Sequence, residues 1–330
     1  MTAQPRILLI GTRASTLATT QTGMVRDALV AHGHAADLHF VHTPGDASQQ
    51  AQTPVAHIGV GVFTETLRNS LAAGECDVAV HSFKDLPTAP DPRFVAVVPP
   101  RVDPREVLVS TGDRTLRELP AGARIGTGAP RRVSQILALR PDVECVPIRG
   151  NIDTRMGRVA GGPAEGPGDL DAVVLARAGL ERVGHLDRVS ETMAVDDITP
   201  APAQGALCVE VRVEDAAAVA AVLALDDPAS HAGALAERSV LATLEAGCTA
   251  PVGAWSALED GVLRLKAGVY ALDGSRRLEQ EITGPVDITD TGDDPLHPHW
   301  KDAARALGVA LGESLLAAGA TAVISGEGPL

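Results

Sequence analysis

Four polar side chains that could do chemistry stand together in the segment AVHSFKDLPT (79–88): His81, Ser82, Lys84 and Asp85. They follow directly on a short apolar run that predicts a buried strand. Ser or Asp at such a junction often only caps the next turn. Alternatively, Lys84 keeps the Asp85 carboxylate ionised, and that carboxylate stabilises developing positive charge or transfers protons. Taken alone, the segment leaves both interpretations open.

A second group consists of arginines in residues 124–158, a window with seven arginines and three acidic residues. Arg131 and Arg132 open a predicted helix directly after the strand end RIGTG, and Arg149 and Arg155 flank GNIDT, a second strand-to-helix junction. Helix N-termini favour anions, and the planar guanidinium fits a carboxylate. An exposed, solvated helix face is the simpler alternative for a charge run. The positions at two junctions favour a ligand that carries several carboxylates.

Two further turns carry polar side chains. In GTRAS, Arg13 and Ser15 stand where a strand passes into a helix that contains Gln21. Ser15 could be an N-cap, or the turn could bind an anion, but the glycine spacing of nucleotide-binding loops is missing. In PAPAQGALCVEVR (200–212), Gln204 stands in a Pro- and Gly-framed turn, which we interpret as a hinge where the chain returns from one half to the other.

One cysteine stands in a turn, within EAGCTAPVG (245–253). Gly247 and Pro251 near Cys248 mark that turn. Because free cysteine behaves as a small hydrophobe, an inert buried thiol is the favoured interpretation of Cys248 taken alone. The four cysteines show no C-x-x-C spacing, so neither a disulfide framework nor a zinc site is expected.

The composition restricts the class of protein. A chain of 330 residues is long enough for two or three domains. Its net charge of −14 and its scarcity of aromatic residues argue against nucleic-acid and membrane-surface binding. The first apolar run is too short for a signal-peptide core, and no run approaches the length of a membrane span. We therefore expect a cytoplasmic protein.

The elements that must position these residues alternate between strand and helix, which predicts α/β halves with parallel sheets. In the first half we expect strands at 6–11, 36–43 and 76–82 and helices at 16–33 and 61–75. In the second half we expect strands ending at 128, at 143–150 and from 171, with helices at 130–140 and 151–160. From about residue 229 an Ala-rich helix leads to antiparallel strands at 254–258, 262–272 and 277–284 and a helix at 301–319. Ligands of such halves lie at the carboxyl ends of the strands, in a cleft.

Taken together, these segments resemble the hydroxymethylbilane synthase family, also called porphobilinogen deaminases. The similar motifs follow one another across most of the chain: GTRASTLATTQ, HTPGD, GVGVFTETLRNSL, DVAVHSFKDLPT, GTGAPRR, RPDVECVPIRGNIDTR, DAVVLARAGLERVG, PAPAQGA and ERSVLATLEAGCTAPVGA. Only the last part, about 260–330, matches weakly.

The resemblance implies an α/β fold of three domains. Two would be similar to periplasmic binding proteins: residues 1–100 with about 204–225, and residues 104–200. The third, 228–330, would be a small α/β domain with an antiparallel sheet. The implied activity is that of a transferase of tetrapyrrole (heme) biosynthesis, which condenses four porphobilinogen molecules with loss of ammonia. The growing oligopyrrole chain would stay on a dipyrromethane cofactor, and the final tetrapyrrole would be released by hydrolysis. The protein would be a cytoplasmic monomer without nucleic-acid or membrane partners.

The same resemblance implies a role for each matching residue. Asp85 matches the catalytic aspartate, and Cys248 matches the cysteine that holds the cofactor through a thioether. The other residues of the cofactor site would be Ser82, Lys84, Arg131, Arg132 and Arg155. The substrate-binding residues would be Arg13, Ser15, Gln21, Phe63, Arg149, Arg182 and Gln204. No metal is implied.

Two departures from the family pattern change what the site offers. Gly128, Ala129 and Pro130 stand where the family often has Ser-Ser-Leu, so two hydroxyl donors are missing, and Pro130 has no N–H. Val60 stands where a lysine is frequent, in a loop (47–62) that could act as a lid. The rival hypothesis is a non-catalytic cytoplasmic clamshell protein that binds a polycarboxylate; it explains the arginines but neither Cys248 nor Asp85.

Overall fold

A computed structural model describes residues 6–41, 62–161, 166–247 and 250–326. The chain divides into two compact units. The first consists of Met1–Arg101 and Ala206–His231, and the second of Val102–Gly205 and Ala232–Leu330. The chain therefore crosses from one unit to the other three times. The bounds of the three domains expected from the sequence stay a prediction.

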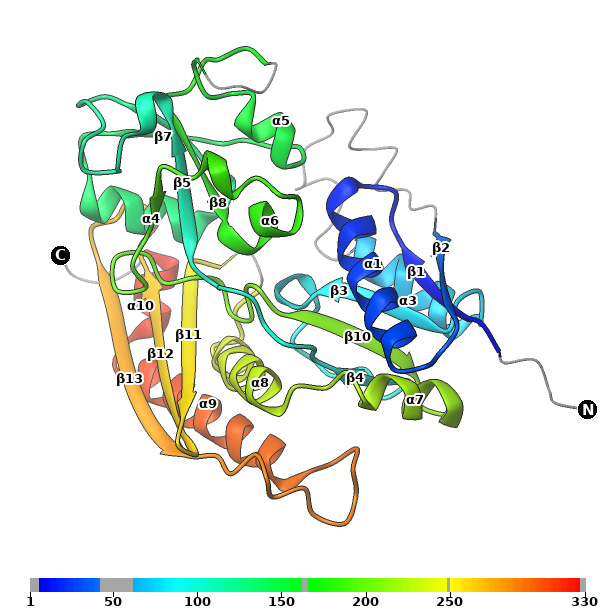
Figure 1. Ribbon diagram of the computed structural model, residues 1–330. Coiled ribbons are helices and arrows are strands. Elements are labelled where there is room, and N and C mark those ends of the chain that lie inside the picture. Colours follow the sequence, from blue (N-terminus) through cyan, green and yellow to red (C-terminus); the bar gives the residue numbers. More distant parts are fainter. Residues whose placement is uncertain (1–5, 42–61, 162–165, 248–249, 327–330) are drawn as a thin grey trace, which may run out of the picture. The chain divides into compact units, whose positions relative to one another are not determined.

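The first unit is built on a five-stranded sheet in the order β2-β1-β3-β10-β4 (Figure 1). Strands β1 to β3 are parallel, whereas β10 runs antiparallel between β3 and β4. Helices α1, α3 and α7 pack on this sheet. The bounds are β1 Leu8–Thr12, α1 Thr16–Ala31, β2 Ala36–Phe40, α3 Val62–Ala72, β3 Val78–Ser82, η2 Phe83–Asp85, β4 Phe94–Val97, β10 Leu207–Arg212 and α7 Ala216–Leu223.

Local sequence signals explain where α1 begins and ends. The Ser15 hydroxyl accepts a hydrogen bond from the Ala18 N–H at 3.4 Å and caps the first turn. Two residues after the last residue of the helix, Gly33 adopts φ +86°, a left-handed conformation that glycine reaches without strain. The helix predicted over 16–33 is confirmed, and Ser15 is its cap.

The second unit repeats the strand order in β7-β6-β8-β5-β9. Strands β6 to β8 are parallel, and β5 lies antiparallel between β8 and β9. The expected parallel sheets are confirmed for three strands of each sheet. Strands β5 and β10 depart from this expectation, and each enters its sheet antiparallel just after the chain has crossed from the other unit. The bounds are β5 Glu106–Ser110, η3 Thr111–Asp113, β6 Arg124–Gly126, α4 Pro130–Leu139, β7 Glu144–Val146, α5 Ile152–Met156, β8 Ala172–Ala176, α6 Arg177–Arg182, η4 Leu186–Arg188 and β9 Glu191–Thr192.

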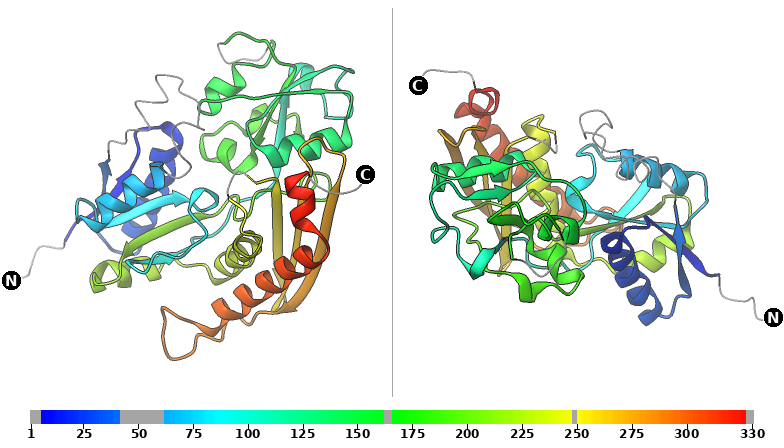
Figure 2. Two further views of the ribbon diagram at one scale, coloured as in Figure 1. Left: turned by 180° about the vertical axis from the view of Figure 1, so that it is seen from behind. Right: turned by 90° about the horizontal axis from the view of Figure 1, so that it is seen from above.

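The rest of the second unit is a three-stranded antiparallel sheet in the order β11-β12-β13, with α9 and α10 packed against it (Figure 2). The predicted strands and closing helix of this part are confirmed. It has an apolar core of its own, which includes Val240, Leu265, Trp300 and Leu311. The bounds are α8 Pro228–Thr243, β11 Val252–Glu259, β12 Val262–Tyr270, β13 Arg277–Pro285, α9 His299–Ala317 and α10 Ala320–Ser325. Within the described ranges, no helix is long and apolar enough to cross a membrane.

Specific contacts fix this C-terminal sheet to the neighbouring part of its unit. The Glu237 carboxylate of α8 accepts a hydrogen bond from the Ala203 N–H at 2.7 Å. The Lys266 ammonium of β12 binds Asp196 at 2.8 Å. Ala203 has φ +59°, which is unfavourable for a residue with a Cβ, so Glu237 holds a strained turn in place directly before the second crossing, between Gly205 and Ala206.

Candidate functional site

The turn after β3 presents Asp85 to solvent. Strand β3 is buried and ends at Ser82, and Phe83 to Asp85 form one short 3-10 turn. The Phe83 side chain is buried, the Phe83 backbone N–H donates to the Ala206 carbonyl at 3.0 Å, and Leu86, the residue after the turn, is also buried. Buried anchors thus hold the backbone, and the Asp85 side chain is exposed.

Two predicted residues of the first unit meet at the end of β3. The Gln21 amide of α1 donates to the Ser82 hydroxyl at 3.1 Å. Ser82 does not cap the 3-10 turn with its side chain, so the capping interpretation fails for this residue. Arg13 and Lys84 are half-buried and each has interaction partners.

The sequence analysis missed a buried ionic network in the same unit. Arg68 of α3 donates to both carboxylate oxygens of Glu210 on β10, at 2.9 and 2.6 Å. The His81 Nε2 lies 3.2 Å from the same carboxylate. Burial by itself would raise the pKa of Glu210, but the hydrogen bonds and charges of Arg68 and His81 outweigh it and lower that pKa to about 2.

In the second unit, the predicted Arg131 and Arg132 are both buried and both bind Glu106, the first residue of β5. The Arg131 Nη2 lies 2.5 Å from Oε1 of Glu106, and the Arg132 Nη2 lies 2.7 Å from Oε2. The Glu106 side chain is fully buried. Glu106 escaped the sequence analysis, although an acidic residue at the start of the apolar run EVLVS is a signal that could have indicated it.

The two guanidiniums use their remaining donors differently. Arg131 also donates to the Thr199 carbonyl at 3.2 Å and to the Gln204 side-chain oxygen at 3.3 Å. Arg132 donates from Nη1 to the Val174 carbonyl at 2.9 Å, but its buried Nε has no hydrogen-bond partner among the described residues. Burial, partly offset by Glu106, lowers the pKa of Arg131. One buried donor of the pair therefore stays unused.

Gln204 is buried directly before the second crossing, where its side-chain nitrogen donates to the Pro104 carbonyl at 2.8 Å. The adjacent Gly205 carbonyl accepts a hydrogen bond from Arg182 at 2.6 Å. Burial lowers the pKa of Arg182 to about 10, and its buried Nε also has no partner within the described part of the chain. The turn predicted as a hinge is thus held by two of the predicted residues.

The remaining two predicted arginines lie nearer the surface. Arg149 is exposed, and Arg155 of α5 is half-buried and donates from Nε to the Gly150 carbonyl at 2.8 Å. Gly150 has φ +101°, so this junction needs a glycine.

Other predicted features lie outside the described residues: Cys248, Val60, the side chain of Phe63 and nearly all of the loop 47–62. The three described cysteines are poor nucleophiles. Cys76 and Cys208 are buried, and burial raises the pKa of Cys76 and of the half-buried Cys145 to about 11. Between residues 6 and 326, where described, no group of three His, Cys, Asp or Glu side chains could hold a metal ion.

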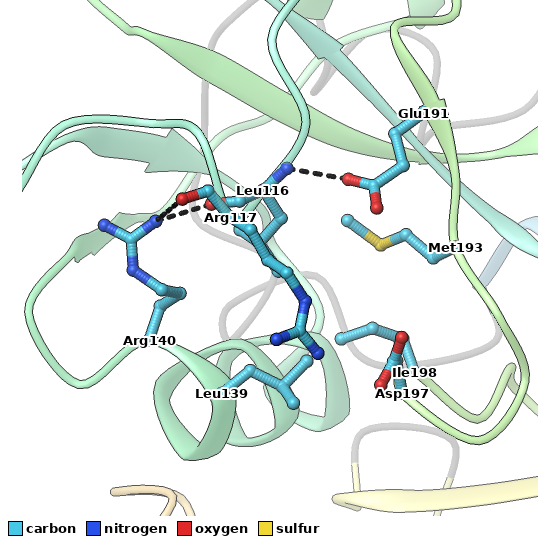
Figure 3. A pocket seen from close by; sticks show the side chains of 8 residues that line it. All are labelled: Leu116, Arg117, Leu139, Arg140, Glu191, Met193, Asp197 and Ile198. Atoms are coloured by element: carbon cyan, nitrogen blue, oxygen red, sulfur yellow. Dashed lines mark hydrogen bonds between the residues drawn. The ribbon is translucent and has the colours of Figure 1, made fainter.

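Two cavities of the second unit lie away from the predicted residues. One of about 290 Å³ has an apolar floor of Leu139, Met193 and Ile198 with charged side chains around it (Figure 3). There Arg140 is bound to backbone carbonyls and Glu191 to the Leu116 N–H. The other, of about 440 Å³, is lined by residues of η3, α5 and η4, including Asp153 and His185. Neither contains any of the site residues expected from the sequence.

The two five-stranded sheets share one strand order, in which the strand that follows a crossing lies antiparallel beside the last strand. With the three-stranded antiparallel sheet near the C-terminus, they define the class: an α/β protein with two similar sheets and a small C-terminal antiparallel sheet. The family model described as "Porphobilinogen deaminase, dipyromethane cofactor binding domain" matches residues 8–220, and "Porphobilinogen deaminase, C-terminal domain" matches 232–317. The chain belongs to the porphobilinogen deaminase family.

Named relatives support this membership. Porphobilinogen deaminase of Corynebacterium glutamicum is 57% identical over 82% of this chain and 88% of its own length. That of Nocardia farcinica is 50% identical over 95% of this chain and 86% of its own. That of Mycobacterium tuberculosis is 52% identical over 82% of this chain and 87% of its own. The match therefore spans most of each protein.

Proposed function

We propose that this chain is a transferase that condenses porphobilinogen into the linear tetrapyrrole hydroxymethylbilane. Four substrate molecules and one water give one product and four ammonia molecules. The observation that carries the proposal is the buried pair Arg131 and Arg132, with a guanidinium Nε left unbonded. Such a donor set suits the acetate and propionate groups that every porphobilinogen unit carries.

The residues present fit the dipyrromethane cofactor of the family, because buried cationic donors suit its four carboxylates. When bound, the cofactor supplies the pyrrole carbon to which substrate units are added. Cys248 would hold it covalently, since the described cysteines are buried or half-buried and two of them have raised pKa values. Its carboxylates would be bound by Lys84, Arg131, Arg132 and Arg155, with Ser82 as a further donor.

The incoming substrate would be bound by a second set of side chains. These are Arg13, Ser15, Gln21, Phe63, Arg149, Arg182 and Gln204. Asp85, exposed at the end of a buried strand, would accept hydrogen bonds from pyrrole N–H groups, stabilise positive charge on them and take up a proton.

Intact mass separates this proposal from a non-catalytic polycarboxylate-binding protein. Purified protein should be heavier than its sequence by two pyrrole units, and Cys248→Ser should have the bare mass. The wild type should also consume porphobilinogen and release ammonia. Bare mass together with no consumption of porphobilinogen would leave the binding protein as the better hypothesis.

We also propose that the enzyme is a cytoplasmic monomer without nucleic-acid or membrane partners. The net charge of −14 supports the last two points, because it disfavours polyanions and anionic lipid surfaces. Gel filtration with light scattering should give one chain of about 34 kDa, and a dimer would contradict it.

A further inference from the structure

Glu106 is a fully buried carboxylate that no step of the proposed function uses. It begins β5 and pairs in the sheet with Ala176, the last residue of β8. Since β5 is antiparallel to β8, Glu106 lies at the edge of the sheet where the parallel strands have their carboxyl ends. Ligand-binding groups of open α/β sheets gather at that edge.

Arg131 and Arg132 leave α4 in different directions, yet both bind one carboxylate. Arg131 and Arg132 are adjacent on α4, and adjacent side chains leave a helix about 100° apart because there are about 3.6 residues per turn. Glu106 binds one with each carboxylate oxygen. Its two oxygens therefore bring together side chains that the helix itself directs apart.

Glu106 also sets the net charge of the cluster that it forms with Arg131 and Arg132. Two buried guanidiniums carry two positive charges, and one ionised carboxylate leaves a net charge of one. Without a counter-ion, two neighbouring buried cations would be strongly disfavoured. The Thr199 and Val174 carbonyls and Gln204 add oxygen acceptors but no charge.

We propose that Glu106 is a positioning residue for ligand carboxylates, which holds Arg131 and Arg132 as a fixed pair with one net positive charge and leaves the Arg132 Nε for one carboxylate of the cofactor. This inference rests on the proposed function, because it takes the cofactor to be the ligand of the arginine pair. Glu106 itself touches neither substrate nor cofactor in this scheme.

The first unit offers a matched control. Glu210 is also buried on an antiparallel strand and also binds an arginine through both oxygens. Its substitution removes a buried carboxylate of the same kind, but from an arginine outside the proposed site. A general loss of stability should therefore appear in both the Glu106 and the Glu210 variants. A weaker stabilisation by the cofactor should appear only in the Glu106 variants.

The experiment measures how much cofactor loading raises Tm. A group that contacts only the native state stabilises it, so the loaded wild type should unfold at a higher temperature than Cys248→Ser, which cannot load. The same pair is prepared in the Glu106→Gln, Glu106→Asp and Glu210→Gln backgrounds, with loading checked by intact mass. This is a double-mutant cycle: the rise in Tm on loading in each variant background is subtracted from the rise in the wild-type background. The result measures the coupling between the substituted residue and the cofactor.

We expect Glu106→Gln to lose most of the rise in Tm on loading, and its cofactor-free form to gain mass from added porphobilinogen about tenfold more slowly or worse. Glu106→Asp keeps the charge but is one methylene too short to hold both arginines well, so it should be intermediate. Glu210→Gln should lower both Tm values and keep the difference. If Glu106→Gln does not fold, the test uses the loaded and cofactor-free proteins of the Glu106→Asp background, and a smaller rise in Tm on loading is again the expected result.

The positioning role would be overturned if both Glu106 variants kept the full rise in Tm on loading and took up the cofactor at the wild-type rate. Equal losses in Glu106→Gln and Glu210→Gln would also overturn it, because the effect would then be general. A wild type of bare mass that consumes no porphobilinogen would refute the proposed function instead, and so the two failures are distinguishable.

Discussion

Asp85 and Glu106 carry the same functional group in opposite surroundings. Asp85 is exposed at the end of a short turn, whereas Glu106 is buried between two guanidiniums. An exposed carboxylate can contact a ligand and exchange a proton, while a carboxylate buried between two guanidiniums is shielded from solvent and held in position. The surroundings are therefore consistent with the proposed catalytic role of Asp85 and the proposed positioning role of Glu106.

At Asp85, we expect Asp85→Asn to lower kcat by about a hundredfold or more, because loss of a positioned proton-transfer group typically costs that much. Stability should change by less than about 0.5 kcal/mol, since the side chain is exposed. Steady-state kinetics and thermal unfolding measure the two quantities. Asp27→Asn, an exposed substitution on α1, should leave both unchanged; near-normal turnover of Asp85→Asn would remove Asp85 from the mechanism.

The sequence pointed to Arg131 and Arg132 as candidate site residues but not to Glu106, the carboxylate that binds both. Arg131 and Arg132 stand at a recognisable helix start, where residue type and local position suffice. Glu106 reaches them across 25 and 26 positions of the chain. Only the packing of β5 beside β8 creates that contact, and no local pattern contains it. The same holds for Arg68 and Glu210, which are 142 positions apart.

Among the elements, the β6–α4 turn explains one departure from the family pattern. A Cβ at Gly128 would lie 2.8 Å from the Ile148 carbonyl oxygen, so the backbone next to this residue leaves no room for a side chain. Ala129 is the N-cap of α4 but offers no side-chain acceptor to the first turn. The two positions that lack a hydroxyl therefore differ. Gly128 has no space for a side chain, whereas Ala129 has the space and lacks only the oxygen that would cap the helix.

This difference predicts opposite effects of two serine substitutions. Ala129→Ser should stabilise the protein by about 1 kcal/mol, because Ser caps a helix better than Ala. Gly128→Ser should destabilise it by about 1–3 kcal/mol, because the Ile148 backbone must move. Urea unfolding of both variants measures this. Destabilisation by Ala129→Ser, or a neutral Gly128→Ser, would contradict the packing described for this turn.

Element boundaries were predictable where a local signal stops the element. The helix over 130–140 starts with proline and is confirmed as α4. The strand predicted over 143–150 is shorter, Glu144–Val146, because Pro147 cannot donate to the sheet. Strands β4 and β9 were not predicted, and neither was β5, because short strands whose partners lie far along the chain leave little periodicity.

For the whole molecule, buried ion pairs make stability depend on pH. The pKa of Glu210 lies at about 2 in the folded protein, below its ordinary value of 4.5. A lowered carboxyl pKa means that the folded state binds fewer protons than the unfolded state between these values. The contribution of Glu210 is therefore complete above about pH 4.5 and is lost as the pH falls towards 2.

Wild type and Glu210→Gln should accordingly differ most near neutral pH. The variant leaves Arg68 buried without its carboxylate, which should cost about 3 kcal/mol or more. The difference in unfolding free energy should shrink as the pH falls from about 4.5 to 2, because protonated Glu210 resembles glutamine. Urea unfolding across this range tests it, and a difference that is constant with pH would show that the charge of Glu210 contributes nothing.

The place of β10 in the first sheet has a consequence for how the chain is made. Strand β4 pairs only with β10 among the described strands, and β3 has one side open until β10 arrives. During synthesis at about 5–20 residues per second, Leu207 follows Val97 by on the order of 5–20 seconds. Throughout that time the nascent chain exposes strand edges that other chains could pair with. The unfinished sheet therefore stays open to pairing with other chains while the ribosome translates residues 102–205, and slower translation lengthens that exposure.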